Sequence, residues 1–174
     1  LDDHLLGHTR FASALFEGMR GMGRIFQGAA TIDSILRGSL IEQAAQAGLR
    51  SLFVGFETLS EDNLSSSNKK QNLGRDYREA IRRLDDLGIM INGSFVFGMD
   101  HDRPDVFKRT VDWAISQGIT TATFHIQTPY PGTALHDRML AEKRVTTNNW
   151  DLYDTRHVVY RTAGMSGAQL KAGY

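Results

Sequence analysis

Ala45-Gln46-Ala47-Gly48-Leu49-Arg50 is the first of three stretches that decide the fold of this chain. The pattern recurs at Asp85-Asp86-Leu87-Gly88-Ile89-Met90 and at Ile115-Ser116-Gln117-Gly118-Ile119-Thr120. Each stretch ends a helical pattern in glycine, the residue that most easily takes the left-handed conformation after a helix. Each glycine then leads into a run of β-forming residues. The recurrence predicts helices and strands in alternation.

The segments before these glycines carry helix signals. Ser39 and Glu42 have the spacing of a capping box, in which each side chain bonds the other residue's backbone N–H. The second helix is indicated by Tyr77, Ile81 and Leu84 at helical spacing. In the third helix Pro104 suits the first turn, and the expected buried stripe consists of Val106, Phe107, Val111, Ala114 and Ile115.

Short runs rich in β-forming residues alternate with these helices. We expect strands over Arg24–Phe26, Ser51–Phe56, Met90–Phe97 and Thr120–Ile126. Strands that alternate with helices pair in parallel through right-handed crossovers. The stretch Ser60–Gly74 is predicted to be a long loop that follows a strand. The chain is therefore predicted to be an α/β protein with a parallel sheet.

The polarity of the strands favours a barrel over an open, doubly wound sheet. One parity of the last strand is polar and consists of Thr121, Thr123, His125 and Gln127. A parallel sheet with helices on both faces is apolar on both faces, whereas a polar face toward the carboxyl ends of the strands is typical of a barrel with a site in its mouth. We predict a partial TIM-like (β/α) barrel of about four βα units.

Composition excludes several classes of function. The chain has 174 residues, 41% of them hydrophobic, which suits a single domain over residues 1–174. The count of lysine plus arginine equals that of aspartate plus glutamate, 20 each, and no basic stripe indicates nucleic-acid binding. No apolar run is long enough to span a bilayer. The absence of cysteine fits a cytoplasmic protein and excludes cysteine-held zinc or clusters within the chain.

Polar residues stand where the predicted strands end, which is where such folds carry their sites. The residues at these positions are Gln27, Glu57, Gly98 to Asp102, and Gln127 to Pro131. A carboxylate such as that of Glu57 can accept two ribose hydroxyls, and Gly98 lets the backbone approach a ligand closely. A carboxylate that caps the next turn and an ordinary turn glycine are the alternatives for these two residues.

Histidines and aspartates raise the question of a metal. The segment Asp100-His101-Asp102 is interpreted as a solvated loop, because no spaced partner accompanies it. His4 and His8 are four residues apart, as in some zinc sites, but Gly7 interrupts the helix and no third ligand is placed. No metal site is predicted. His125 is either a hydrogen-bonding core histidine or a ligand contact.

Several segments occur in one order: Asp2-Asp3-His4-Leu5, Phe26-Gln27-Gly28, Gly48-Leu49-Arg50 through Val54-Gly55-Phe56-Glu57-Thr58, Gly93-Ser94-Phe95-Val96-Phe97-Gly98 and Thr128-Pro129-Tyr130-Pro131-Gly132-Thr133. This order resembles the radical S-adenosylmethionine family, closest to the subgroup whose members often carry an N-terminal cobalamin-binding domain. The resemblance is closest over residues 1–137, and 138–174 is expected to be a helix and an irregular tail. It implies the C-terminal portion of a six-stranded (β/α) barrel, and hence a piece of a longer polypeptide.

The resemblance also implies roles for single residues. Asp2 and Asp3 correspond to the end of the family's second strand, near the methionine amino group of S-adenosylmethionine, and Glu57 corresponds to the ribose contact. The segment from Ser94 to Gly98 corresponds to the glycine motif beside adenine and methionine. Gln127 and Thr128 correspond to the adenine contact. The predicted cofactor-binding residues are therefore Asp2, Asp3, Gln27, Glu57, Ser94, Gly98, Gln127 and Thr128. His4 and His101 replace residues common in the family, so their contacts are not carried over. No catalytic residue is assigned.

For the intact parent, the resemblance implies reductive cleavage of S-adenosylmethionine at a [4Fe–4S] cluster to a 5′-deoxyadenosyl radical. The three-cysteine loop of the family is missing here. We therefore expect this piece to be inactive alone, to depend on the rest of its polypeptide and to self-associate through an open sheet edge. The alternatives are a (β/α) hydrolase or aldolase that uses Glu57 and His125, and a non-catalytic half-barrel binding module.

Overall fold

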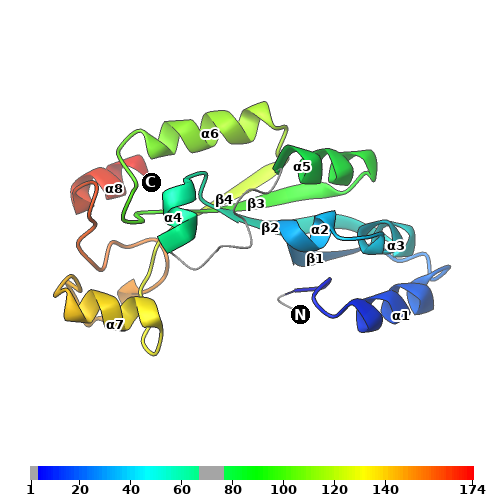
Figure 1. Ribbon diagram of the computed structural model, residues 1–174, viewed down its shortest axis with the longest axis horizontal. Coiled ribbons are helices and arrows are strands. Elements are labelled where there is room, and N and C mark those ends of the chain that lie inside the picture. The colour runs from blue at the N-terminus through cyan, green and yellow to red at the C-terminus, as the bar shows by residue number, and fades with distance from the viewer. Residues whose placement is uncertain (1–3, 67–76) are drawn as a thin grey trace.

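The computed structural model describes residues 4–66 and 77–174 (Figure 1). Its strands are β1 (Phe26–Thr31), β2 (Leu49–Glu57), β3 (Met90–Phe97) and β4 (Thr121–Ile126). Its helices are α1 (Thr9–Met19), α2 (Ile32–Leu36), α3 (Leu40–Ala47), α4 (Glu61–Ser66), α5 (Tyr77–Asp86), α6 (Val106–Ser116), α7 (Ala134–Ala141) and α8 (Gly167–Gly173), with a 3-10 helix over Trp150–Leu152. None of the described helices is long and apolar enough to cross a membrane.

The strands form one parallel sheet in the order β1-β2-β3-β4. Strands that neighbour one another in sequence are therefore neighbours in the sheet, as helix–strand alternation predicts. Gly48, Gly88 and Gly118 have φ angles of 113°, 66° and 70°, so the left-handed helix exits are confirmed. The prediction of an α/β fold with a parallel sheet is confirmed.

The first strand differs from the prediction, because it begins at Phe26 instead of ending there. Gly48 packs closely against the segment that precedes β1. A Cβ at Gly48 would be 1.9 Å from the carbonyl oxygen of Arg24. The strand continues through small residues, and a Cβ at Gly28 would be 2.6 Å from Leu5 Cδ2. Small residues have low β propensity but allow this close packing.

One face of the sheet is sealed by α2, α3, α5 and α6, whose apolar residues form a single core with those of the strands. Its centre is an aromatic ladder made of Phe56, Phe95, Phe124 and Trp113. Phe95 stacks on Phe56 and on Phe124, with ring centroids 5.4 and 5.7 Å apart, and Trp113 of α6 meets Phe56 edge-on at 5.4 Å. Such pairs add to the stability that area burial alone supplies.

The opposite face, which we call the open face, carries polar and small residues. The strand register places Gly55 beside Ser94, and Ser94 beside Thr123. In Figure 1, α1 and α7 lie at the two ends of this side of the sheet, and no described helix crosses its middle. The side chain of Phe53 on this face is 40% exposed. Among the described residues, helices therefore cover the middle of one face only.

The asymmetry of the two faces predicts unequal costs for the same truncation. We expect Phe95→Ala to lower the free energy of unfolding by about 3 to 5 kcal/mol, because it removes a fully buried ring and leaves a cavity. Phe53→Ala, in the neighbouring strand but on the open face, should cost less than about 1 kcal/mol. Urea unfolding of both variants tests this difference, and equal losses would contradict the proposed sidedness.

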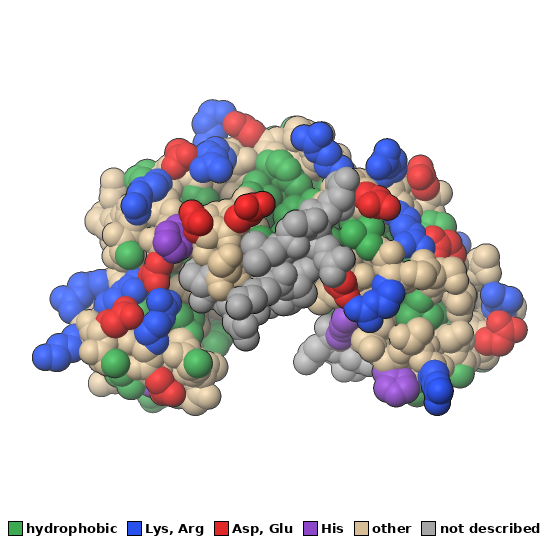
Figure 2. Space-filling model, in the orientation of Figure 1, with side chains coloured by type: hydrophobic (Ala, Val, Ile, Leu, Met, Phe, Trp, Pro, Cys, Tyr) green, Lys and Arg blue, Asp and Glu red, His purple; other side chains and the backbone are tan. Residues whose placement is uncertain are grey.

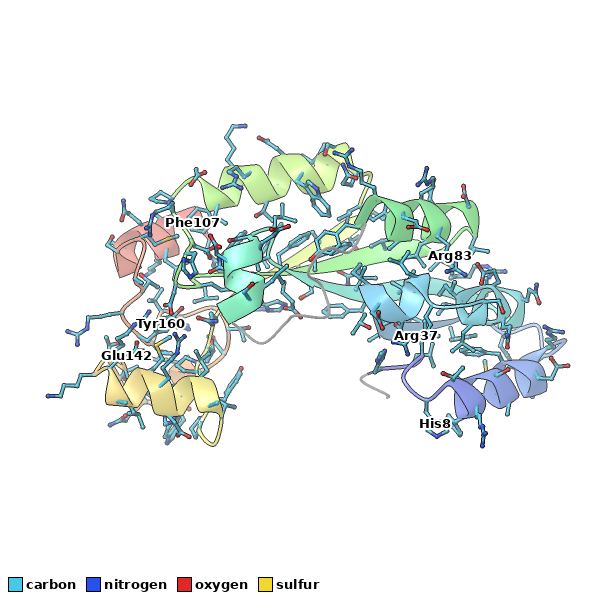
Figure 3. The ribbon with its side chains drawn as sticks, viewed as in Figure 1. His8, Arg37, Arg83, Phe107, Glu142 and Tyr160 are labelled. Carbon is cyan, nitrogen blue, oxygen red and sulfur yellow. The ribbon has the colours of Figure 1, made fainter. Side chains whose placement is uncertain are left out.

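The expected capping box at α3 is wrong. Ser39 stands at the N-cap but makes no side-chain capping bond. Glu42 pairs instead with Arg83 of α5 at 2.7 Å, and Arg83 also donates to the carbonyl oxygen of Ile35 at 2.8 Å (Figure 3). Arg83 of the neighbouring helix therefore binds the carboxylate of Glu42, which the local spacing had predicted to cap α3.

The expected stripe of α6 is also partly wrong. Val111 is exposed and Ile115 is 73% exposed, whereas Thr110 and Ala114 are buried. The helix begins at Val106, two residues after Pro104. Residues four apart share a helix face, so the inward stripe runs one position earlier than the most apolar residues indicate.

Helices occur both in the stretch predicted to be a long loop and at the C-terminal end of 138–174, which was expected to be a helix and an irregular tail. Within Ser60–Gly74 the chain forms α4, and residues 67–74 lie outside the described residues. At the C-terminal end, Val145 and Tyr160 form an antiparallel bridge. Helix α8 then begins with a capping box made by Ser166 and Gln169. It packs tightly on α6, because a Cβ at Gly173 would be 2.2 Å from the ring of Phe107 (Figure 3).

Candidate functional site

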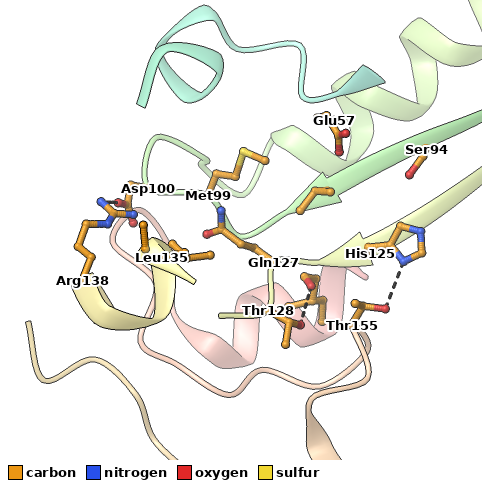
Figure 4. A pocket seen from close by; sticks show the side chains of 13 residues that line it. Glu57, Ser94, Met99, Asp100, His125, Gln127, Thr128, Leu135, Arg138 and Thr155 are labelled. Atoms are coloured by element: carbon orange, nitrogen blue, oxygen red, sulfur yellow. Dashed lines mark hydrogen bonds and ion pairs between the residues drawn. The ribbon is translucent and has the colours of Figure 1, made fainter. Parts of the chain in front are cut away.

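A cavity of about 640 Å³ lies at the carboxyl ends of β2, β3 and β4, where α7 faces the sheet (Figure 4). It is lined by Glu57, Ser94, Val96, Met99, Asp100, His125, Ile126, Gln127, Thr128, Ala134, Leu135, Arg138 and Thr155. This volume is in the range of small-molecule sites. Figure 2 shows the molecule hollowed on the same side, between the lobe of α7 and the lobe of α1.

Four of the eight predicted cofactor-binding residues meet in this cavity. Glu57 arrives from β2, Ser94 from β3, and Gln127 and Thr128 from the segment that follows β4. They meet because the carboxyl ends of parallel strands lie at one edge of the sheet. The sequence therefore identified residues from three separate strands that the fold brings together.

The other predicted residues are placed differently. Gln27 is exposed near the start of β1 and does not line the cavity. Its assignment rested on a strand that ended at Phe26, and the carboxyl end of β1 is in fact at Thr31. Asp2 and Asp3 lie outside the described residues. Gly98 lies just past β3, directly before the lining residue Met99.

Glu57 occupies its position through a backbone irregularity. Its φ angle is 64°, and the pairing of β2 with β3 shifts register between Gly55 and Glu57. A bulge of this kind turns a strand end and redirects a side chain. Gly55 lies beneath it, and a Cβ there would be 2.8 Å from Glu57 Oε1, so a larger residue would displace this carboxylate. Left-handed backbone at a non-glycine residue costs free energy and is concentrated at functional sites.

This geometry predicts an unusual order of stability among variants of Glu57. Both Glu57→Gly and Glu57→Ala remove the carboxylate, but only glycine removes the penalty of left-handed backbone. We expect the glycine variant to unfold with a free energy about 1 kcal/mol higher than the alanine variant. The same pair of substitutions at Thr58, where φ is not positive, should favour alanine. Chemical denaturation of the four variants measures this inversion, which would be absent if Glu57 had ordinary strand backbone.

His125 is oriented by a second residue with left-handed backbone, Thr155, whose φ angle is 64°. Thr155 lies along β4, since its carbonyl oxygen accepts the N–H of Ile126 at 2.7 Å. The hydroxyl of Thr155 donates to the carbonyl oxygen of Asp154 at 2.6 Å and lies 3.2 Å from Nδ1 of His125. A hydroxyl has one hydrogen, so Thr155 accepts from Nδ1–H. Nε2 then carries the lone pair and can accept a hydrogen bond from a ligand in the cavity. The hydrogen bond expected of His125 is present, and the side chain also lines the cavity, where contact with a ligand stays a prediction.

The tautomer of His125 should depend on the hydroxyl of Thr155. In the native chain we expect ¹⁵N NMR to detect the Nδ1–H form of His125. Thr155→Ala should move the population toward the Nε2–H form that imidazoles in water favour, whereas Thr155→Ser should keep the native form because it retains the acceptor. An unchanged tautomer in the alanine variant would show that Thr155 does not set it.

The loop after β3 is held by a buried carboxylate, so its interpretation as a solvated loop is wrong. Asp102 is only 2% exposed. It accepts the backbone N–H groups of Gly98 and Met99 at 2.9 and 3.0 Å, and the side-chain amide of Asn63 at 2.7 Å. Burial raises the pKa of Asp102 above its usual value, although these three bonds oppose the rise. The carboxylate holds Gly98 at a φ angle of 93°, a left-handed conformation that suits glycine.

Tyr160 closes the same region from the C-terminal segment (Figure 3). Its buried hydroxyl donates to the carbonyl oxygen of Gly98 and lies 3.1 Å from the side-chain oxygen of Gln127. Burial, together with the charge of Asp100, raises the pKa of Tyr160 above its ordinary range, so the hydroxyl stays protonated. Two predicted residues are thus oriented by a residue that the sequence pattern assigned to an irregular tail.

An ion network forms the rim of the cavity beside α7. Asp100 forms ion pairs with Arg138 at 2.8 Å and with Arg144 at 2.6 Å. Arg144 also forms an ion pair with Glu142 at 2.9 Å. Burial alone would raise the pKa of Asp100, but the two arginines outweigh it and hold this pKa below its usual range. Sequence reasoning missed this rim. The only signal for it in the sequence was that Arg138 lies four residues after Ala134 in α7, a spacing that puts both residues on one face of the helix.

His8, the second histidine of the pair near the N-terminus, has an ordinary structural role. Nδ1 of His8 accepts the N–H of Phe11 at 3.2 Å and so caps α1, which begins after it at Thr9. His4 and His8 therefore do not share a helix face. Within residues 4–66 and 77–174, no three histidine, aspartate or glutamate side chains are grouped as metal ligands.

The fold and the cavity define an α/β protein with a ligand-sized site at the strand ends, and comparison with known proteins narrows this class. No family profile matches the chain. It is 30% identical over 98% of its length to bacteriochlorophyllide d C-12(1)-methyltransferase and 25% identical over 70% to bacteriochlorophyllide d C-8(2)-methyltransferase, both of Chlorobaculum tepidum. It spans 37% and 27% of the lengths of these proteins. The chain is thus related in sequence to methyltransferases.

Solved structures agree on the fold. Two structures of the radical S-adenosylmethionine methyltransferase TsrM from Kitasatospora setae match with TM-scores of 0.58 and 0.63 at 18% and 17% identity. The matches cover 74% and 81% of this chain and 27% and 28% of TsrM. The first structure contains tryptophan and an analogue of S-adenosylmethionine, and the second contains cobalamin and a [4Fe–4S] cluster. At this identity the likeness concerns the fold alone.

Proposed function

We propose that this chain forms part of the (β/α) barrel of a radical S-adenosylmethionine methyltransferase, and that its strand-end cavity binds S-adenosylmethionine. The observation that carries the proposal is the convergence of Glu57, Ser94, Gln127 and Thr128 on one cavity of about 640 Å³. Relatives that are methyltransferases support methyl transfer as the reaction of the whole protein. The S-adenosylmethionine analogue in TsrM supports the cofactor.

The barrel is supported by the one-sided burial of the sheet. Parallel sheets are normally covered on both faces, and a polar, uncovered face is expected where strands curve around a barrel interior. The N–H of Leu5, in the turn before α1, donates to the carbonyl oxygen of Ala29 in β1 at 2.9 Å, so this turn packs against β1.

The chemistry of the cavity suits a nucleoside with a sulfonium group. The carboxylate of Glu57 can accept the two ribose hydroxyls, and the hydroxyl of Ser94 and the amide of Gln127 offer donors and acceptors for a base. The hydroxyl of Thr128 already donates to the carbonyl oxygen of Ile126 at 3.0 Å, so it faces the cavity only as an acceptor. The carboxylate of Glu57 also favours a cation near the ribose.

An iron–sulfur cluster does not fit the residues of this chain, because clusters are held mainly by cysteine thiolates and the chain has none. The proposal therefore assigns to these residues only the binding and orientation of S-adenosylmethionine. The [4Fe–4S] cluster and the cobalamin are proposed for other parts of the whole protein, and so is turnover.

The hydrolase or aldolase alternative has less support. Glu57 and His125 do line one cavity, but such a reaction needs a metal or a Schiff-base lysine beside them. No lysine is among the described residues that line the cavity. Lys69 and Lys70 lie outside the described residues.

The proposal is tested by a titration of the ¹⁵N-labelled chain with S-adenosylhomocysteine, followed by NMR. We expect amide shifts at Glu57, Ser94 and Gln127. The native chain should prefer S-adenosylhomocysteine to its 2′-deoxy analogue by about tenfold, since hydrogen bonds to a charged group contribute about 1.5 to 3 kcal/mol. Glu57→Gln should remove most of this preference.

The control variant is Glu17→Gln, which changes an exposed carboxylate on α1. It should bind both compounds as the native chain does. Shifts confined to other parts of the chain, or a preference that survives in Glu57→Gln, would refute the assignment of the cavity to S-adenosylmethionine.

A further inference from the structure

Helix α7 turns one side toward the cavity, and this side is not explained by a nucleoside site. The residues on it are Ala134, Leu135 and Arg138, which share a face because they are three and four positions apart. Met99 faces Leu135 across the cavity edge, and the two form an apolar wall. The wall lies beside Gln127 and apart from Glu57, which projects from a different strand (Figure 4).

Arg138 keeps most of its hydrogen-bonding capacity. A guanidinium group has five N–H donors, and within the described residues Arg138 uses only Nη1, toward Asp100. Its side chain is 43% exposed and lines the cavity. Two donors of a planar fork can therefore be presented to a ligand without any change in the rest of the network.

Arg144, by contrast, uses all three of its nitrogens within the protein and fixes Asp100 from the other side. It donates to Asp100, to Glu142 and to the carbonyl oxygen of Arg161 at 2.6, 2.9 and 2.7 Å. Asp100 therefore remains ion-paired if Arg138 engages another anion. The single charge of Asp100 is shared by two guanidinium groups, which leaves Arg138 only partly neutralised.

We propose that Arg138 anchors a carboxylate of the methyl-accepting substrate, and that the apolar wall of Met99 and Leu135 holds the apolar body next to that carboxylate. This inference rests on the proposed function, because it assigns the part of the cavity that S-adenosylmethionine would leave to the acceptor. It gives the substrate class as an apolar molecule with a carboxylate at one end.

A carboxylate fits this position better than a phosphate. Arginine binds a carboxylate through two parallel N–H bonds and needs no further cation. A phosphate group carries nearly two negative charges and would lie beside Asp100 with one available guanidinium. The repulsion between like charges in a partly buried site disfavours that arrangement.

The test compares two probes of the same shape, 2-naphthoate and 2-naphthalenemethanol, in NMR titrations of the 174-residue chain. We expect naphthoate to bind at least tenfold more tightly than the neutral alcohol and to shift the amides of Leu135 and Met99. Arg138→Gln should bring naphthoate to the affinity of the alcohol. Arg138→Lys should retain part of the difference, because it keeps the charge without the fork.

Arg82→Gln, on the exposed side of α5, is the matched control and should behave as the native chain. Equal affinity for the two probes, or full discrimination in Arg138→Gln, would overturn the proposal. Displacement of naphthoate by S-adenosylhomocysteine would also overturn it, since Arg138 would then bind the carboxylate of the cofactor. If S-adenosylhomocysteine does not bind, the naphthoate titrations are unaffected, so the failure of the proposed function is recognised separately.

Discussion

The structure depends on the unequal burial of the two faces of its parallel sheet. On one face the aromatic ladder of Phe56, Phe95, Phe124 and Trp113 seals the strands under helices. Burial of these rings supplies much of the free energy that holds the strands in register. The other face can then carry Ser94 and other polar residues without weakening the core. A site needs such a rigid, separately stabilised support.

Buried polar bonds extend this support to the loops at the strand ends. Asp102 binds two backbone N–H groups of the turn after β3 and links it to Asn63 of α4. Tyr160, distant in sequence, bonds the carbonyl oxygen of Gly98 in the same turn. Loops with few contacts are usually mobile, but this one is held by fully satisfied polar groups. Gln127 is therefore presented to the cavity from an ordered frame.

The cavity also contains local strain. Glu57 and Thr155 have positive φ angles, and they line the cavity from different elements. Strained backbone persists only where the surrounding structure enforces it. Here the bulge of β2 enforces it at Glu57, and the bond from Ile126 enforces it at Thr155. The two side chains are thus oriented before any ligand binds, which lowers the entropy cost of binding.

Local sequence patterns were sufficient for the alternation of helices and strands, the left-handed glycines, and the strand-end positions of Glu57, Gln127 and Thr128, whereas Ser94 was assigned to the site through the family resemblance. These features follow from periodicity and from the parallel topology, in which every strand ends at the same edge. Single-residue patterns could not predict the contacts between distant segments.

Several features depend on which segments become neighbours. They are the pairing of Glu42 with Arg83, the burial of Asp102, the placement of Gln27 away from the cavity, and the rim formed by Arg138 and Arg144. The sequence by itself determined which side chains stand at the strand ends. Only the tertiary structure decided which of them face one another and which are buried, because burial and charge pairing are set by partners far away along the chain.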